Sequence, residues 1–162
     1  MKGSGKDDLD RWAELADRVL VIAREIQFRG YEDAPVVPLT ATEGIVMRYM
    51  QDHPAAAPNQ IAAAVGLQRS NLSTLMRGLE GHGLVVRTVS ESDRRGVTVR
   101  LTERGRRNYL AARREWAAAI ASAAGNDIRG LNGALTLLKE IAAGLIAMRP
   151  EKAGRDMARA ED

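Results

Sequence analysis

The chain contains no cysteine among its 162 residues and only two histidines, His53 and His82. The absence of cysteine excludes disulfide bonds, thiolate nucleophiles, thiol-oxidation switches and any zinc site that uses cysteine. Neither histidine lies in a metal-ligand motif, and the chain has no P-loop, GxGxxG or HExxH sequence. We therefore expect a protein that is not an enzyme and that holds neither a metal nor a cofactor.

Long uncharged segments are also lacking. The longest stretch without Asp, Glu, Lys or Arg runs from His53 to Gln68, is interrupted by prolines and amides, and is shorter than the ~18 apolar residues of a membrane span. The first ten residues carry no apolar segment of a secretory signal, so we expect a cytoplasmic protein that does not enter a membrane. With 45% hydrophobic and 28% charged residues, the composition predicts a soluble globular domain with its own core.

Lysine is absent from the segment between Leu67 and Arg114, although this is the most basic part of the chain. It holds eleven arginines and four acidic residues, a net charge of +7, whereas the remainder holds 13 basic and 17 acidic residues, a net charge of −4. Arginine makes bidentate contacts with phosphate and guanine, so this segment favours a surface that faces a polyanion. Charges solvated on helix faces are the alternative interpretation.

Apolar spacing predicts four helices in the first half of the chain. Residues 8–29 carry an apolar stripe and are followed by a loop with two prolines. Thr40 to Glu43 has the spacing of a capping box, which predicts a helix over 41–51 with Ile45, Val46, Tyr49 and Met50 facing inward. Pro58 and Gly66 delimit a short helix, and a further helix over 68–82 has Leu72, Leu75, Leu79 and His82 on its apolar side.

After residue 82 the spacing of apolar residues changes from that of a helix to that of β-strands. Residues 84–90 and 96–102 are rich in Val and Thr and flank a polar loop, which predicts an antiparallel hairpin with an arginine-tipped loop. Thr102 begins a long helix, broken at Gly125 and Asn126, and a last helix with leucines at heptad-like spacing ends before Pro150. The predicted fold class is mainly α, within α+β.

A short helix, a turn, a second helix and a hairpin follow one another in the order of a winged helix-turn-helix, in which the second helix enters the major groove of DNA. The outward side of residues 68–82 carries hydroxyl, amide and guanidinium groups, which hydrogen-bond to base edges and phosphates. A polar helix face that merely meets water is the alternative. We favour DNA binding because the turn spacing and the charged hairpin occur together.

From Leu39 to Arg107 the chain resembles the MarR (multiple antibiotic resistance regulator) family of transcription factors. The matching strings are LTATEGIVMRYM, IAAAVGLQRSNLSTLMRGLEGHGLVVR and, most specifically, SDRRGVTVRLTERG. The resemblance implies a winged helix-turn-helix lobe over 39–104. It also implies dimerisation segments over 1–38 and 105–150, with a polar tail over 151–162.

The resemblance further implies the residues that meet double-stranded DNA. On the recognition helix they are Arg69, Ser70, Asn71, Ser73, Thr74 and Arg77, and at the start of the preceding helix Asn59 and Gln60 are expected to contact phosphates. In the wing, Asp93 is expected to pair with a neighbouring arginine, while Arg94 or Arg95 enters the minor groove. Two departures from the family pattern are Gln68, a weak helix cap, and Gly78 with Gly81, which leave the length of the helix open.

The resemblance also implies a homodimer that acts as a ligand-responsive repressor on a palindromic operator, with recognition helices about 34 Å apart. The apolar surface of the last helix is too broad to leave in water, which independently favours association with a second chain. A small aromatic or phenolic effector is expected near the junction of the lobe and the dimerisation helices. The candidate residues there are Trp12, Arg18, Phe28, Tyr49, Trp116 and His82.

Two rival functions remain open at this point. One is a metal-responsive regulator that uses histidine and carboxylate ligands. The other is a winged helix that serves protein contact or nonspecific, architectural DNA binding. Competition between specific and bulk DNA would separate the last of these from an operator-binding regulator.

Overall fold

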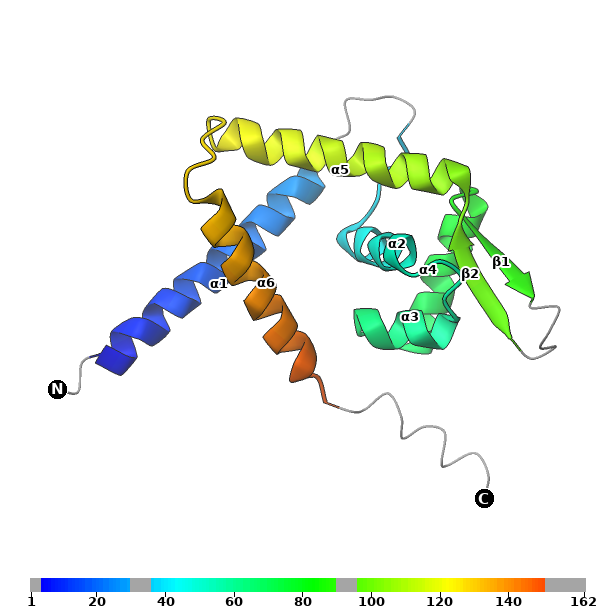
Figure 1. The fold of residues 1–162 in the computed structure, drawn as a ribbon, viewed down its shortest axis with the longest axis horizontal. Coiled ribbons are helices and arrows are strands. Elements are labelled where there is room, and N and C mark those ends of the chain that lie inside the picture. Colours follow the sequence, from blue (N-terminus) through cyan, green and yellow to red (C-terminus); the bar gives the residue numbers. More distant parts are fainter. Residues whose placement is uncertain (1–3, 30–35, 90–95, 151–162) are drawn as a thin grey trace, which may run out of the picture.

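The computed structural model describes residues 4–29, 36–89 and 96–150 and shows a mainly helical chain with one small sheet (Figure 1). This confirms the predicted fold class. In the described part of the chain the elements are α1 (Ser4–Phe28), α2 (Ala41–Asp52), α3 (Pro58–Val65), α4 (Arg69–Gly81), β1 (Val85–Val89), β2 (Val97–Leu101), α5 (Glu103–Ala123) and α6 (Leu131–Ala147).

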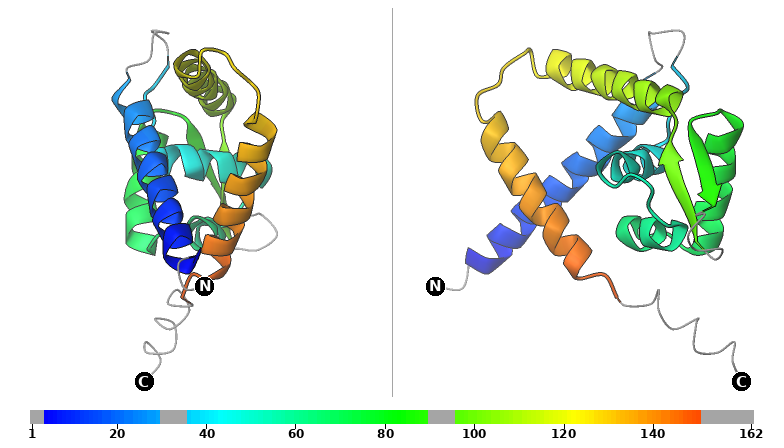
Figure 2. Two further views of the ribbon diagram at one scale, coloured as in Figure 1. Left: turned by 90° about the vertical axis from the view of Figure 1, so that its left-hand side faces the viewer. Right: turned by 45° about the vertical axis from the view of Figure 1, so that its right-hand side comes forward.

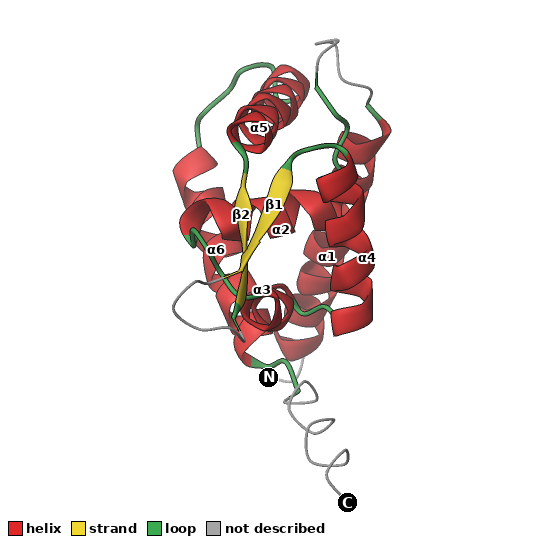
Figure 3. Cartoon of the chain, turned by 90° about the vertical axis from the view of Figure 1, so that its right-hand side faces the viewer, coloured by secondary structure: helices red, strands yellow, loops and turns green. Residues whose placement is uncertain are grey.

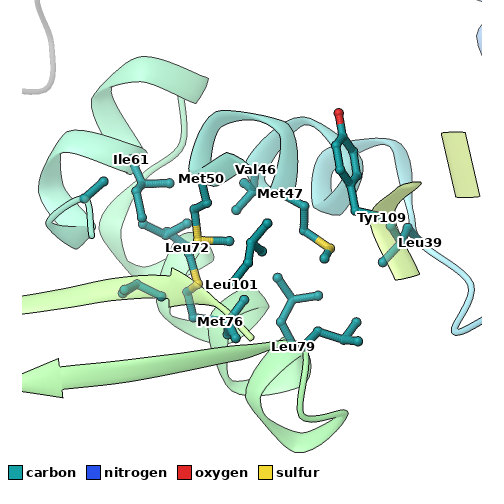
Figure 4. Packing of buried hydrophobic residues seen from close by; sticks show 14 of the residues in the cluster. Leu39, Val46, Met47, Met50, Ile61, Leu72, Met76, Leu79, Leu101 and Tyr109 are labelled. Carbon is teal, nitrogen blue, oxygen red and sulfur yellow. The ribbon is translucent and has the colours of Figure 1, made fainter. Parts of the chain in front are cut away.

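The core lies in one lobe formed by α2, α3, α4 and the β1–β2 hairpin, and the start of α5 closes it (Figure 4). Met47 and Met50 of α2, Ile61 of α3 and Met76 of α4 all belong to this core. The predicted inward face of α2 was wrong at one position. Ile45 is 56% exposed, whereas Met47 is fully buried, because the buried face of the helix includes Val46, Met47 and Met50.

The helices of the lobe begin and end where local signals predict. In α2, the Thr40 hydroxyl accepts a hydrogen bond from the Glu43 backbone N–H at 3.2 Å, and the Glu43 carboxylate accepts one from the Thr40 N–H at 2.8 Å. This confirms the capping box. Gly66 ends α3 with φ of +72°, a left-handed conformation that glycine adopts without steric cost.

The hairpin is antiparallel, with Val85 opposite Leu101 and Val89 opposite Val97, as the sequence predicts. A further bridge joins it to the connection between α2 and α3, because the Val99 N–H donates to the Ala56 carbonyl at 2.9 Å. Thr102 then donates to the Gly83 carbonyl at 2.7 Å and also caps α5. These bonds hold the strands against the helices, which a two-stranded sheet needs for stability.

Two contacts join α5 to the preceding segments. Asn108, which is 7% exposed, accepts from the Val37 N–H at 2.7 Å and donates to the Val37 carbonyl at 3.0 Å. The half-buried Trp116 packs on Gly44 of α2, where any larger residue would meet the indole ring. These contacts fix α5 on the lobe.

The helices α1 and α6 lie largely outside the lobe. They cross in Figure 1 but separate when the molecule is turned by 90° (Figure 2). No residue of α6 is buried, and the predicted apolar stripes of both helices face solvent in the single chain. None of the helices that the structure describes is long and apolar enough to span a bilayer.

Candidate nucleic-acid interface

The outward face of α4 carries every polar residue predicted for the recognition helix, and all of them are exposed. They are Arg69, Ser70, Asn71, Ser73, Thr74 and Arg77. Leu72, Met76 and Leu79 anchor the opposite face in the core, so helical geometry directs the polar residues outward. Arg77 donates to the Thr74 hydroxyl at 3.2 Å.

Three sequence-based expectations concern the length, the start and the buried side of α4. The helix continues past Gly78 and ends at Gly81, one residue before the predicted end. Gln68 precedes the helix without a side-chain cap bond, as a poor capping residue predicts. The placement of His82 on the apolar side was wrong, because His82 lies beyond the helix and is exposed, while Met76 is the buried residue that the spacing argument missed.

Asn59 and Gln60 lie exposed at the start of α3. The Asn59 side-chain oxygen accepts from the Gln60 N–H at 2.9 Å, and the Gln60 side-chain oxygen accepts from the Ala57 N–H at 2.9 Å. Their acceptor oxygens therefore serve the N-terminus of α3, and the NH₂ donors are the groups suited to a phosphate oxygen.

The start of α3, the body of α4 and the hairpin lie beside one another in Figure 3. Residues from all three line a hollow of about 500 Å³. Arg69, Ser73 and Asn59 line it, and Leu72, Met76, Val97 and Val99 contribute apolar surface. This combination suits a nucleic-acid backbone, because arginines bind phosphate while apolar surface accommodates sugar.

Arg87 of β1 also lines this hollow and was not among the predicted DNA contacts. Its Nε donates to a Glu80 carboxylate oxygen at 2.9 Å, and both side chains are partly exposed. The signal was present in the sequence, since Arg87 is one of the eleven arginines between Leu67 and Arg114. The register, which pairs Arg87 with the buried Val99, agrees with the Glu80 contact in placing Arg87 on the side of the hairpin that faces α4.

The predicted wing residues Asp93, Arg94 and Arg95 lie outside the described residues. The strands that lead into this loop end at the pair Val89 and Val97. Val97 and Gly96 line the hollow next to α4.

The predicted effector residues occupy two separate regions of the single chain. On α1, Trp12 is exposed, Arg18 pairs with Glu14 at 3.2 Å, and Phe28 lies under the Arg24 guanidinium at 4.9 Å from the ring centroid.

In α2, Tyr49 stacks on His53 with ring centroids 4.2 Å apart, and Trp116 of α5 covers Gly44 of α2. His82 lies apart from both regions, just beyond the end of α4.

The titration shifts of the described residues lie away from α4. Burial raises the pKa of the Tyr109 hydroxyl above its ordinary value of 10.0, although Arg113 and Arg48 oppose the shift. Hydrogen bonds from Arg129 lower the pKa of Asp127 in the turn between α5 and α6. Among the described residues no group of three or more His, Cys, Asp or Glu side chains is arranged to hold a metal ion.

Comparison with known proteins finds a family model, described as the MarR family, that matches residues 37–96. A search of curated proteins finds no match. Among solved structures, the transcriptional repressor CouR bound to a 23-mer DNA duplex is 30% identical, with a TM-score of 0.63 over 80% of this chain and 89% of that chain.

Two further structures share the fold at lower identity. The transcriptional regulator BldR from Sulfolobus solfataricus has a TM-score of 0.68 at 20% identity, covering 88% of this chain and 99% of that chain. NadR in complex with 4-hydroxyphenylacetate has a TM-score of 0.54 at 20% identity, covering 92% and 96%. The motifs, the exposed polar face of α4 and these matches agree that the chain belongs to the MarR family of DNA-binding transcriptional regulators, which are not enzymes.

Proposed function

We propose that the protein is a ligand-responsive repressor that binds a palindromic operator as a homodimer. The observation that carries this proposal is the exposed apolar surface of α1 and α6. No residue of α6 is buried, although Leu131, Leu135, Leu138 and Leu145 lie on it. Exposing this many large apolar side chains to water is unfavourable in free energy, and the same helices of a second copy would cover them.

A homodimer of this kind matches the symmetry of a palindromic site. A two-fold axis through the helical region presents one α4 to each half-site, about 34 Å apart. The domain boundaries follow the same division, with residues 39–104 for DNA and residues 1–38 and 105–150 for dimerisation. Asn108 and Trp116 fasten α5 to the lobe, so the orientation of α5 in a dimer would determine the orientation of each α4.

We assign the DNA contacts by position on the lobe. Arg69, Ser70, Asn71, Ser73, Thr74 and Arg77 face the major groove from α4, and Asn59 and Gln60 face a phosphate from the start of α3. We add Arg87 as a phosphate contact, because it shares the hollow with Arg69. Asp93 stiffens the wing, and Arg94 or Arg95 reads the width of the minor groove.

We further propose that a small aromatic or phenolic anion binds beside the junction of α1, α2 and α5 and weakens DNA binding. The support is NadR, a protein of the same fold whose structure contains 4-hydroxyphenylacetate. The aromatic and basic residues proposed to line the site are Trp12, Arg18 and Phe28 on α1 and Tyr49 and Trp116 on α2 and α5, which lie in two separate regions of the single chain. Since α1 is exposed in the single chain, the partner chain would complete such a site. The repressor role is supported by the likeness to CouR, which is itself a transcriptional repressor.

Three measurements test the proposal. Light scattering at micromolar concentration should give a dimer, and a monomer would refute the assembly. A duplex selected from random DNA should outcompete bulk DNA by ~10³ or more, whereas equal competition would indicate a nonspecific binder. Titration of that complex with 4-hydroxyphenylacetate and related phenolic acids should release the DNA, and unchanged binding across the series would refute the proposed effector class.

A further inference from the structure

One polar contact joins the end of α6 directly to the helix-turn-helix. Arg149, two residues beyond α6, donates from Nη1 to the Ala64 carbonyl oxygen at 2.8 Å, across 85 residues of sequence. Ala64 lies in the last turn of α3, where carbonyl groups lack intrahelical partners and the helix dipole is negative. A guanidinium group is therefore well matched to this helix end.

The same side chain lies against the turn between α3 and α4. A Cβ added to Gly66 would come within 2.9 Å of Arg149 Cζ and 3.0 Å of its Nη1, so the guanidinium group rests on the Cα of the turn glycine. Gly66 is the residue with left-handed φ that ends α3 and directs the chain toward α4. Arg149 thus contacts the turn that determines how α3 and α4 lie relative to each other.

The position of this contact is informative because α6 buries no residue of its own in the chain. A helix without a buried anchor ends in a guanidinium group that binds the lobe. Long arginine side chains on exposed surfaces lose conformational entropy when they are held in one geometry. The hydrogen bond to a helix C-terminus and the contact with Gly66 offset that loss together.

We propose that Arg149 is a positioning residue for DNA recognition, which fastens the helix-turn-helix to α6 and thereby fixes the spacing between the two recognition helices. This inference rests on the proposed homodimer. The lobe is then held at two places. Asn108 and Trp116 of α5 hold the segment before α2 and α2 itself, and Arg149 holds the turn before α4. Removing the second attachment leaves the lobe free to adjust, so binding becomes weaker on the preferred operator and more tolerant of altered half-site spacing.

A double-mutant cycle tests the contact itself in the full chain. Gly66→Ala introduces strain at positive φ and displaces the guanidinium group, while Arg149→Ala removes that group. If the contact exists, the losses of stability in urea unfolding are not additive, because both changes break the same hydrogen bond. Additive losses, measured at equal protein concentration, would overturn the proposed contact whatever the oligomeric state.

Operator spacing tests the positioning role. The duplex is the one selected from random DNA, compared with a variant that has one base pair inserted between half-sites, which rotates one half-site by about 35°. The wild type should bind the inserted duplex much more weakly, and Arg149→Ala should reduce this discrimination by about tenfold, the size expected for one charge-assisted hydrogen bond. Lys139→Ala, which removes a positive charge from α6, is the matched control and should retain the discrimination.

The outcomes separate this inference from the proposed function. A dimeric Arg149→Ala variant with unchanged spacing discrimination would overturn the positioning role while leaving the repressor proposal intact. A monomeric wild type would overturn both. Loss of affinity that is equal for the two duplexes would also overturn the positioning role, because it would make Arg149 a general contributor to stability. Partial restoration of discrimination by Arg149→Lys, which keeps one donor, would support it.

Discussion

Replacing Asn108 by alanine tests whether one side chain holds the segment before α2 against α5. The amide makes two hydrogen bonds with the backbone of Val37, at 2.7 Å and 3.0 Å, and only 7% of its surface is exposed. Each bond contributes about 1 kcal/mol net, and the Val37 N–H and carbonyl would lose their partners. Because Val37 is half-buried, water reaches these groups in part, so we expect a total loss of about 2–3 kcal/mol.

The assay is urea unfolding followed by circular dichroism at a fixed protein concentration, since dimerisation contributes to stability. Asn71→Ala, exposed on α4 and outside the proposed dimer helices, is the control and, without DNA, should change the free energy of unfolding by less than about 0.5 kcal/mol. A loss for Asn108→Ala no larger than that of the control would show that the Asn108 amide does not hold Val37 against α5.

Asn108→Asp separates the two bonds, because a carboxylate keeps the acceptor toward the Val37 N–H but faces the Val37 carbonyl without a donor. Burial and this carbonyl should raise the folded-state pKa of Asp at position 108 above its unfolded value. The stability of this variant should therefore rise as the pH falls through that pKa, and a pH-independent difference from wild type would contradict the assignment of donor and acceptor.

The remaining predictions concern DNA binding and alkaline stability. Arg77→Ala should cost roughly 1–3 kcal/mol on the selected operator and spare nonspecific DNA, and equal losses on both would reassign the residue to phosphate. Arg87→Ala should weaken binding to all sequences and reduce the salt slope by about one, whereas Arg100→Ala, whose partner Val86 places it on the other face of the hairpin, should have a smaller effect. Because burial raises the folded pKa of Tyr109, its contribution to stability should be present below pH 10.0 and decline as the pH rises above it, and Tyr109→Phe should reduce this decline in unfolding experiments.

Most of the DNA-binding lobe could be predicted because its signals are local. The capping box at Thr40, the glycine that ends α3 and the alternation of Val and Thr in the hairpin each depend on a few neighbouring residues. The outward face of α4 follows from helical periodicity once the apolar side is known. Even there, periodicity alone placed Ile45 inward instead of Met47, because two adjacent apolar stripes compete and only tertiary packing selects between them.

The parts that resisted prediction depend on contacts between distant segments. Nothing near Asn108 in the sequence indicates that it binds Val37, and nothing near Arg149 indicates that it reaches Ala64. Arg87 required the strand register, which sequence alone left open. The candidate DNA contacts and effector residues were assigned by resemblance, and the structure gives the described ones their exposure and neighbours, but their roles stay predictions.

The packing of Trp116 on Gly44 gives the protein a built-in optical reporter. Its indole lies half-buried where α5 meets the DNA-binding lobe, whereas the only other tryptophan, Trp12, stands exposed on α1. With Trp12 replaced by phenylalanine, the emission of Trp116 alone would follow any movement of α2 relative to α5. In the opposite variant, Trp12 alone would report whether α1 passes from water into a contact with a second chain. One chain therefore offers separate fluorescence signals for lobe movement and for association, without an attached dye.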